Sequence, residues 1–181
     1  MCIRDRHNHT LPVLLNTEKV EKGDCFFIPA GTVHAICKGC YIAEIQQTSD
    51  ITYRIYDYDR RDKNGNPREL HTELATDVIN FCEQKQHSIH YHQHENHTEE
   101  LVSCNYFTTN YLKFDKEVEK DYIELDSFVI YMCLEGNFTL VYDVDKTVKV
   151  NKGETILVPA ILKNLFLIPE TEAEILEIYI R

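Results

Sequence analysis

A single histidine follows a run of glycine and proline whose spacing could place it at the mouth of a β-barrel. The run reads Gly23, five residues, Pro29, Ala30, Gly31, two residues and His34. Because proline cannot donate to a strand ladder, we expect a strand that ends at Pro29 and a reversal at Gly31, where a side chain would clash. A returning imidazole could ligate zinc, iron or nickel. A hydrogen-bonded rim histidine is the alternative, and the flanking glycines and proline favour the metal interpretation.

A second pair of histidines, His7 and His9, has the H-x-H spacing of metal ligands. Val13 and Leu14 stand where the glutamate of such a site would follow. The pair also lies too close to Gly23 to leave room for intervening strands. We therefore interpret this spacing as a coincidence.

Two weaker patterns could also bind metal or carry redox chemistry. Cys37 and Cys40 have C-x-x-C spacing, but no second pair stands near them in the sequence, so a turn between strands is the preferred interpretation. Alternating histidines crowd the polar stretch before residue 100 and could ligate a metal adventitiously, although a polar connector is preferred. They are His87, His90, His92, His94 and His97.

The elements that position these residues are expected to be short strands and one helix. Strand-favouring residues predict strands at Asp24–Pro29, Tyr41–Gln47 and Tyr53–Tyr58. A turn should follow at Lys63–Pro67. Asn66 could then cap a helix whose first residue is Pro67. Its apolar stripe would be Leu70, Leu74, Val78 and Ile79.

The second half of the sequence has the pattern of an all-β domain that follows a polar linker. We expect three parts: residues 1–82 as part of a metal-binding barrel with its helix, 83–100 as the linker, and 101–181 as a small β domain without a metal site. A hairpin turn is predicted at Glu135–Asn137. The expected strands are Phe128–Cys133, Phe138–Val144, Thr155–Val158 and Ile175–Ile180.

An internal echo at an offset of 130 residues indicates that a structural unit is duplicated. Val20–Gly23 resembles Val150–Gly153, and Pro29-Ala30 is repeated as Pro159-Ala160 with the same distance from the glycine. Chance agreement of a common turn-strand-turn pattern is the alternative, and six identities in register favour duplication.

Composition limits the partners of the 181-residue chain. The net charge of -11 argues against nucleic acid and anionic membrane as main partners, because both need a basic face. No stretch is long and apolar enough for a transmembrane span, and no signal peptide is expected. The seven cysteines are odd in number and irregularly spaced, so we expect reduced thiols in a cytoplasmic protein.

Four stretches together resemble one enzyme family. They are Phe26–Ile36, Ile42–Asp50, Thr52–Arg60 and Pro67–His71. They look like the zinc-dependent type I mannose-6-phosphate isomerases of bacteria, which are cupins, and the resemblance runs from about Leu11 to the C-terminus. It implies a mainly β fold: an incomplete first cupin-type barrel with one helix, then a second small cupin-like domain.

The resemblance also implies a chemistry and its residues. It implies Zn²⁺, a sugar phosphate substrate and an aldose–ketose isomerisation through an enediolate. His34 matches the last zinc-ligating histidine and Arg54 the catalytic arginine. Asp50 borders the active site of the family, and Glu44 is a further candidate that could orient groups near the reacting proton.

The chain departs from the family in one respect. The other zinc ligands of the family, a His pair or Gln-x-His and then a Glu, would lie before the residues present here. We therefore expect a C-terminal fragment that is inactive alone. A non-catalytic cupin module that binds a sugar or a partner is the main alternative. A cupin dioxygenase or epimerase would explain the Thr-Tyr-Arg segment poorly.

Overall fold

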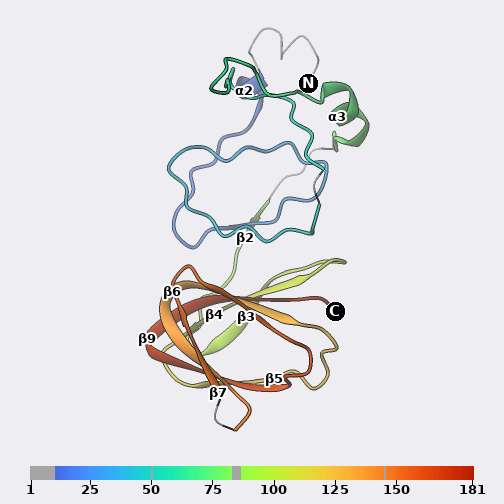
Figure 1. Ribbon diagram of the computed structural model, residues 1–181. Helices are drawn as coiled ribbons and strands as arrows, with labels where there is room; N and C mark the ends of the chain where they lie inside the picture. The colour runs from blue at the N-terminus through green and yellow to red at the C-terminus, as the bar shows by residue number, and fades with distance from the viewer. Residues whose placement is uncertain (1–10, 50, 83–86, 145) are drawn as a thin grey trace. The chain divides into compact units, whose positions relative to one another are not determined.

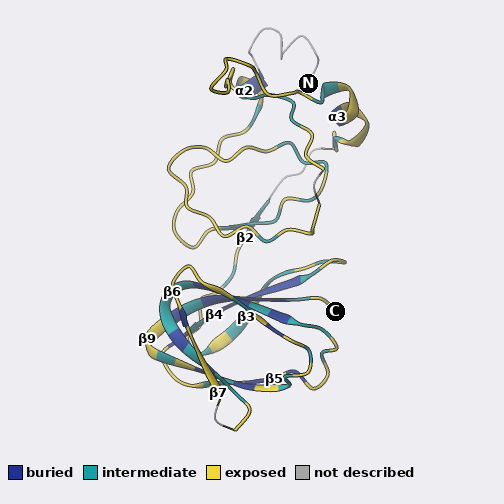
Figure 2. Cartoon of the chain, viewed as in Figure 1, coloured by how far each residue is buried: buried dark blue, intermediate teal, exposed yellow. Residues whose placement is uncertain are grey.

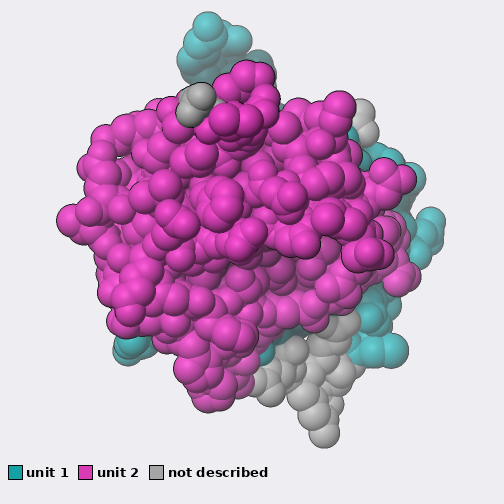
Figure 3. All heavy atoms as spheres, turned by 90° about the horizontal axis from the view of Figure 1, so that it is seen from below, with its two compact units in different colours: residues 1–42, 48–88 teal, residues 43–47, 89–181 magenta. Residues whose placement is uncertain are grey.

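The computed structural model describes residues 11–49, 51–82, 87–144 and 146–181 (Figure 1). The chain divides into two compact units, which Figure 3 shows in different colours. The first comprises Met1–Ile42 and Thr48–Ser88, and the second comprises Ala43–Gln47 and Ile89–Arg181. No helix among the described residues is long and apolar enough to cross a membrane.

The second unit is an antiparallel sheet curled around one apolar core (Figure 1). Within the described residues, the order of its strands is β3-β4-β9-β6-β7, while β5 pairs with β9 and β8 pairs with β6. The strands are β3 (His97–Ser103), β4 (Thr108–Phe114), β5 (Val118–Asp121), β6 (Val129–Tyr142), β7 (Lys146–Asn151), β8 (Thr155–Val158) and β9 (Asn164–Tyr179).

Two long strands hold this sheet together. β9 pairs with β5 through Asn164–Leu167 and with β4 through Ala173–Tyr179. β6 pairs with β9 from Val129 to Tyr142, while its two ends pair with β8 and β7. Because each long strand serves two neighbours along the same edge, the sheet can bend over itself and enclose side chains. The fully buried ones include Phe114, Tyr131, Phe138, Leu140, Leu165 and Leu167.

The predicted hairpin turn at Glu135–Asn137 is wrong. These residues lie inside β6, where the pairing with β9 shifts on either side of Gly136, so they form a β-bulge rather than a turn. Gly136 has φ +70, and a Cβ there would lie 2.0 Å from the carbonyl oxygen of Glu172. The glycine that suggested a turn is needed because the two strands approach closely at a bend.

The sheet also has an apolar outer face. Tyr111, Leu176 and Ile178 are buried there, and Ile45 from the segment Ala43–Gln47 packs against them. Leu176 and Ile178 alternate along β9 with inward-facing Ile175. β9 is therefore apolar on both faces, which is typical of a strand covered on both sides.

The first unit contains little regular structure. Its elements are α2 (Leu11–Leu14), β1 (Cys25–Phe26) and α3 (Thr72–Val78), with β2 (Ser88–Ile89) at the division between the units. β1 pairs with β2. The strands predicted at Tyr41–Gln47 and Tyr53–Tyr58 are wrong. A strand needs a neighbour for its backbone groups, and no described strand pairs with either segment.

The predicted helix exists as α3, but it begins later than expected. Its N-cap is His71, without a side-chain cap bond, whereas Pro67 makes an isolated bridge with Arg61. The preceding turn is formed as predicted: the Asp62 carboxylate accepts the backbone N–H groups of Asn64 and Asn66, each at 2.8 Å. These bonds hold Asn66 in the turn, so it cannot cap a helix.

The two units differ sharply in burial (Figure 2). In the first unit, the only buried hydrophobic residues among those described are Leu11 and Ala75. The stripe expected on α3 stays open to solvent, with Leu74 and Val78 more than half exposed. Several large apolar side chains in this unit are exposed as well, including Ile36, Tyr41, Ile51 and Phe81. An apolar surface of this extent usually marks a face that another segment or partner covers.

The bulge at Gly136 leads to a first prediction. Gly136→Ala should lower the free energy of unfolding by about 3 kcal/mol, since it adds a left-handed backbone cost of ~1–2 kcal/mol to a steric clash of ~1–3 kcal/mol. Gly153→Ala is the matched control, because Gly153 has φ +82 but its Cβ would meet nothing within 4 Å. That control should cost about 1 kcal/mol. Urea denaturation followed by circular dichroism measures both, and equal losses would contradict the importance of the close approach.

Candidate functional site

The Gly23–His34 run forms the turns that its sequence predicts. Gly23 has φ 98, and the N–H of Asp24 donates to the carbonyl of Glu21 at 3.2 Å. The Asp24 carboxylate in turn accepts the N–H of Glu21 at 2.8 Å. Beyond the short strand β1, the N–H of Thr32 donates to the carbonyl of Pro29 at 3.2 Å. The chain therefore reverses directly after the proline.

The steric requirement for glycine at Gly31 is confirmed. Gly31 has φ +85, and a Cβ there would lie 2.6 Å from the carbonyl oxygen of Val78. The Gly31 carbonyl accepts the N–H of Asn80 at 2.9 Å. The reversal therefore packs directly against the end of α3, which fixes the loop that carries His34.

His34 itself is exposed, and its ring is oriented by the backbone. Its Nδ1 lies 2.9 Å from the carbonyl oxygen of Thr32. When Nδ1 carries the proton, it donates to that carbonyl and leaves Nε2 with a lone pair for a metal ion. This arrangement, a backbone acceptor on one ring nitrogen and a ligand position on the other, is common among metal-binding histidines.

The described residues do not complete a zinc site around His34. No three His, Cys, Asp or Glu side chains in the described ranges lie where they could share a metal ion. Catalytic zinc usually takes three protein ligands and a water. The donor set of the described chain therefore does not by itself fit the zinc ion that the family resemblance implies.

The echo near Lys152 reproduces the first of these turns. Gly153 has φ +82, and the N–H of Glu154 donates to the carbonyl of Asn151 at 2.9 Å. The Glu154 carboxylate accepts the Asn151 N–H at 2.8 Å, as Asp24 does for Glu21. The two copies thus share the same hydrogen-bonded turn, with an acidic residue directly after the glycine.

The second turn of the echo differs where the metal chemistry would be. The N–H of Leu162 donates to the carbonyl of Pro159 at 3.0 Å, as Thr32 does to Pro29. Ile161 takes the place of Gly31 and does not have the positive φ of that glycine, and Asn164 replaces His34. The same scaffold therefore lacks the imidazole in its second copy.

The backbone of Arg54 makes two hydrogen bonds with His71, one to its imidazole ring and one to its backbone. The Arg54 N–H donates to His71 Nδ1 at 3.1 Å, and the Arg54 carbonyl accepts the His71 N–H at 2.7 Å. The guanidinium Nη1 donates to the carbonyl of Glu69 at 3.3 Å. Arg54 is partly buried, and its side chain is therefore positioned by backbone groups rather than by a carboxylate.

Asp57, an acidic residue three positions after Arg54, is bound by Arg68. The Arg68 guanidinium donates to both carboxylate oxygens of Asp57, through Nε at 2.7 Å and through Nη2. The hydrogen bond from Arg68 lowers the pKa of Asp57, and the positive charges of Arg54 and Arg60 add to this effect. The Arg54 cation is therefore not neutralised by a direct bond to Asp57.

The two other predicted site residues are not brought to this cluster by any described contact. Asp50 lies outside the described residues. Glu44 is exposed on the segment Ala43–Gln47, which belongs to the second unit, while His34 and Arg54 belong to the first. In residues 11–49 and 51–82, no hydrogen bond or ion pair joins Glu44, His34 and Arg54 to one another. Their shared role stays a prediction.

Two histidines of the polar stretch lie against the same carboxylate. His94 Nδ1 lies 2.6 Å from Oε1 of Glu99, and His97 Nδ1 lies 3.5 Å from the same oxygen. The hydrogen bond from His94 lowers the pKa of Glu99. His97 and Glu99 are part of β3, so the end of this polar stretch is already part of the sheet.

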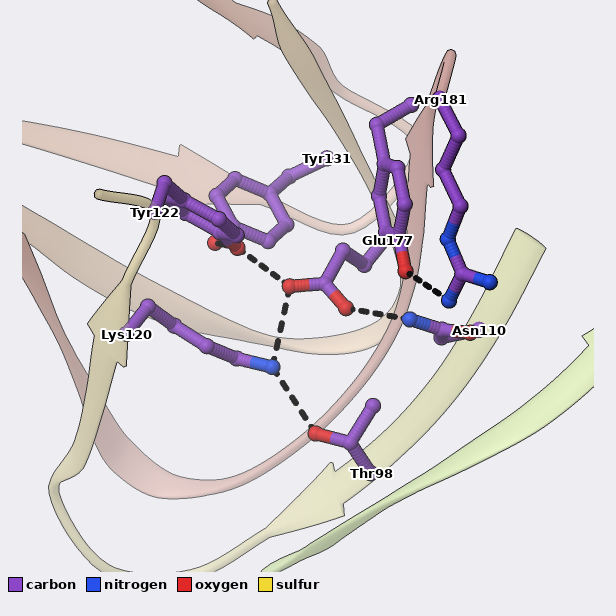
Figure 4. Close-up of polar contacts among 8 residues, drawn as sticks. Thr98, Asn110, Lys120, Tyr122, Tyr131, Glu177 and Arg181 are labelled. Carbon is purple, nitrogen blue, oxygen red and sulfur yellow. Dashed lines mark hydrogen bonds and ion pairs between the residues drawn. The ribbon is translucent and has the colours of Figure 1, made fainter. Parts of the chain in front are cut away.

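The largest buried polar cluster lies in the second unit, and the sequence analysis did not identify it. Glu177 of β9 accepts hydrogen bonds from Asn110 at 2.7 Å and from Tyr122, and it pairs with Lys120 at 3.0 Å (Figure 4). Lys120 also donates to the hydroxyl of Thr98 at 2.8 Å. The signal in the sequence is a carboxylate that follows inward-facing Ile175 by two residues, on the face of β9 that should be apolar.

Two buried tyrosines belong to the same hydrogen-bonded cluster. The hydroxyl groups of Tyr122 and Tyr131 are hydrogen-bonded to each other, and Tyr122 donates to Glu177. Burial raises the pKa of both tyrosines, and the negative charge of Glu177 acts in the same direction. Both phenols therefore stay protonated and act as neutral donors. The Glu177 carboxylate is almost fully buried and has donors on both oxygens, as a buried charge requires.

Removing the cation from this cluster should be costly. Lys120→Met should lower the free energy of unfolding by about 3–5 kcal/mol, because Glu177 would keep a buried charge without its counter-ion. Lys149→Met is the control: Lys149 pairs with Glu170, and both side chains are half exposed. It should cost at most about 1 kcal/mol. Urea denaturation measures both losses. A loss for Lys120→Met as small as that of the control would contradict a stabilising role for the buried pair.

Comparisons with known proteins point to one group of enzymes, although no family model matches the chain. The chain is 36% identical over 148 residues to mannose-6-phosphate isomerase ManA of Bacillus subtilis. This alignment covers 81% of this chain and 46% of that protein. It is 53% identical over 66 residues to the mannose-6-phosphate isomerase of Streptococcus mutans, or 36% of this chain and 21% of that protein.

A solved structure agrees with these sequence matches. The crystal structure of mannose 6-phosphate isomerase from Bacillus subtilis has a TM-score of 0.58 and 31% identity, covering 73% of this chain and 41% of that chain. The predicted mainly β fold is confirmed, with its strands concentrated in the second unit. The part that matches this chain makes up about half of the Bacillus subtilis protein ManA, 46% of its length. This chain is therefore a relative of the bacterial mannose-6-phosphate isomerases over the part of their sequence that it shares.

Proposed function

We propose that this chain is part of a cytoplasmic mannose-6-phosphate isomerase, which interconverts mannose 6-phosphate and fructose 6-phosphate. The observation that carries the proposal is the identity of 36% to an enzyme of that name over 81% of the chain. The local geometry supports it, since Gly31 and α3 fix the loop of His34 and the His71 backbone fixes Arg54.

The isomerisation moves a proton between two adjacent carbons of the sugar and passes through an enediolate. Negative charge develops on oxygen during this step, and a fixed cation stabilises it best when the cation needs no reorganisation. We assign this role to Arg54, because its backbone is clamped to His71 and its guanidinium is bound to a neutral carbonyl. Glu44 and Asp50 are candidates for orienting groups around the proton that moves.

Zinc is the cofactor implied by the resemblance, and His34 is its proposed ligand. The described residues provide one suitable imidazole and no group of three ligands. We therefore propose that the other ligands belong to residues outside the described ranges, in a longer protein of which this sequence is a part. The exposed apolar side chains of the first unit support this, because they need a cover that the described residues do not supply.

The ligand proposal predicts weak metal binding by the chain alone. The purified 181-residue chain should retain far less than one zinc ion per molecule after dialysis, because one imidazole does not hold the ion, and it should have negligible isomerase activity. Metal analysis of the wild-type chain and of His34→Ala tests this. Stoichiometric zinc that is lost only in His34→Ala would contradict the proposal, since it would mean that this chain completes the site by itself.

The role of Arg54 is testable in a complete enzyme. The aligned segment of the Bacillus subtilis relative can be exchanged for that of this chain, and isomerase activity and zinc content measured in the chimera. Arg54→Ala should lower kcat by about a hundredfold or more, since it removes a donor to the developing oxyanion, and it should leave the zinc content unchanged.

Arg60→Ala is the matched control for this experiment. Arg60 lies six residues further along the chain and stacks over Tyr58, with its guanidinium carbon 5.7 Å from the ring centroid. It should leave kcat within about twofold of the parent chimera, as expected for a surface substitution. An Arg54→Ala chimera that keeps its activity, or one that loses its metal, would count against the assigned role.

A non-catalytic cupin module is the second candidate function. It is favoured by one observation, the lack of three convergent metal ligands among the described residues. Such a module would bind a sugar phosphate without turnover. An inactive chimera that still binds mannose 6-phosphate would support this candidate over the enzyme.

A further inference from the structure

The turn that follows His34 carries two exposed thiols that the isomerase chemistry does not use. Cys37 and Cys40 are both free and exposed, and Lys38 and Gly39 are the central residues of a turn between them. Gly39 has φ +89, the left-handed value that the third residue of a type II turn adopts. The sequence predicted a turn at this place, and the structure confirms it.

This turn places the two cysteines within disulfide range. The first and fourth Cα atoms of a β-turn lie less than ~7 Å apart, and disulfides join residues whose Cα atoms are ~4.4–6.8 Å apart. A Cβ on Gly39 would meet nothing within 4 Å, so the turn stands in open space and can adjust to the geometry of the bond. Among the other described cysteines, Cys82 is exposed as well, but it lies 42 residues beyond Cys40 in the sequence, and Cys104 is partly buried. Cys25 is half-buried and Cys133 is buried.

We propose that Cys37 and Cys40 form a reversible intramolecular disulfide, which makes this turn a redox modification site. The co-reactant is a low-molecular-weight disulfide such as glutathione disulfide. One cysteine thiolate attacks a sulfur of that disulfide and expels one glutathione thiolate. The second cysteine thiolate attacks the mixed disulfide and expels the other glutathione. Two protein thiols are oxidised, one glutathione disulfide is reduced to two glutathiones, and the two thiol protons pass to them.

The disulfide would restrict the backbone of the segment that follows His34. Cys37 lies three residues after His34, and Cys40 lies three residues before Ala43, where the chain enters the second unit. Closing the turn covalently removes freedom from this connection, and reduction restores it. The site is independent of the isomerase proposal, since it needs only the exposed turn and its two thiols.

Lys38 provides a direct assay because trypsin cleaves between the two cysteines. Cleavage after Lys22, Lys38 and Arg54 yields the peptides 23–38 and 39–54. The whole chain is incubated with glutathione disulfide, its remaining thiols are alkylated, and it is digested without reductant. We expect one covalently linked pair of these peptides by mass spectrometry. Treatment with dithiothreitol before alkylation should abolish the linked pair.

Peptide 23–38 also contains Cys25, so three variants identify the bonded cysteine. Cys37→Ser and Cys40→Ser should each abolish the linked pair, and Cys25→Ser should leave it unchanged. A linked pair that survives in Cys37→Ser and disappears in Cys25→Ser would overturn the proposal in favour of a bond from Cys25. Free thiols, or stable glutathione adducts on both cysteines without a linked pair, would overturn it as well.

Discussion

The antiparallel ladder between β6 and β9 is the interaction on which the second unit depends. The two strands pair from Val129 with Tyr179 to Tyr142 with Leu165, and β4, β5, β7 and β8 each pair with one of them. The ladder bends at the bulge around Gly136, where no side chain fits between the strands. This bend lets one pair of long strands supply both walls of the core, so the packing of the other strands follows from it.

Among the mostly apolar buried residues described in the second unit lies a pair of opposite charges. Glu177 and Lys120 lie among side chains from separate strands, and Tyr122 and Asn110 satisfy the carboxylate further (Figure 4). Such a cluster offsets the cost of burying its charges only when all of its donors are in place. Its contacts join β4 and β9 through Asn110 and β5 and β9 through Lys120.

The first unit is organised differently, by local backbone contacts rather than by a core. The Gly31 carbonyl accepts the N–H of Asn80 at the end of α3. The backbone of Arg54 is hydrogen-bonded to the ring and to the N–H of His71, the residue just before the same helix. These contacts fix the loops of the two residues that resemble catalytic and metal-binding positions. They bury little apolar surface, however, and hydrophobic burial is the main source of stability in a domain of this size. The loops are therefore fixed by local hydrogen bonds, while large apolar side chains of the first unit stay exposed to solvent.

The sequence by itself determined the features that depend on neighbouring residues. These include the turns at Gly23, Gly31 and Lys63–Pro67, the strand Thr155–Val158, and the motif around His34 that resembles the isomerases. Tertiary structure decided the rest. The expected strand at Tyr53–Tyr58 does not form because no described strand pairs with it, and Gly136 bends a strand because β9 lies against it. The Glu177 cluster depends on residues up to 79 positions apart, from Thr98 to Glu177, which only the folded sheet brings together.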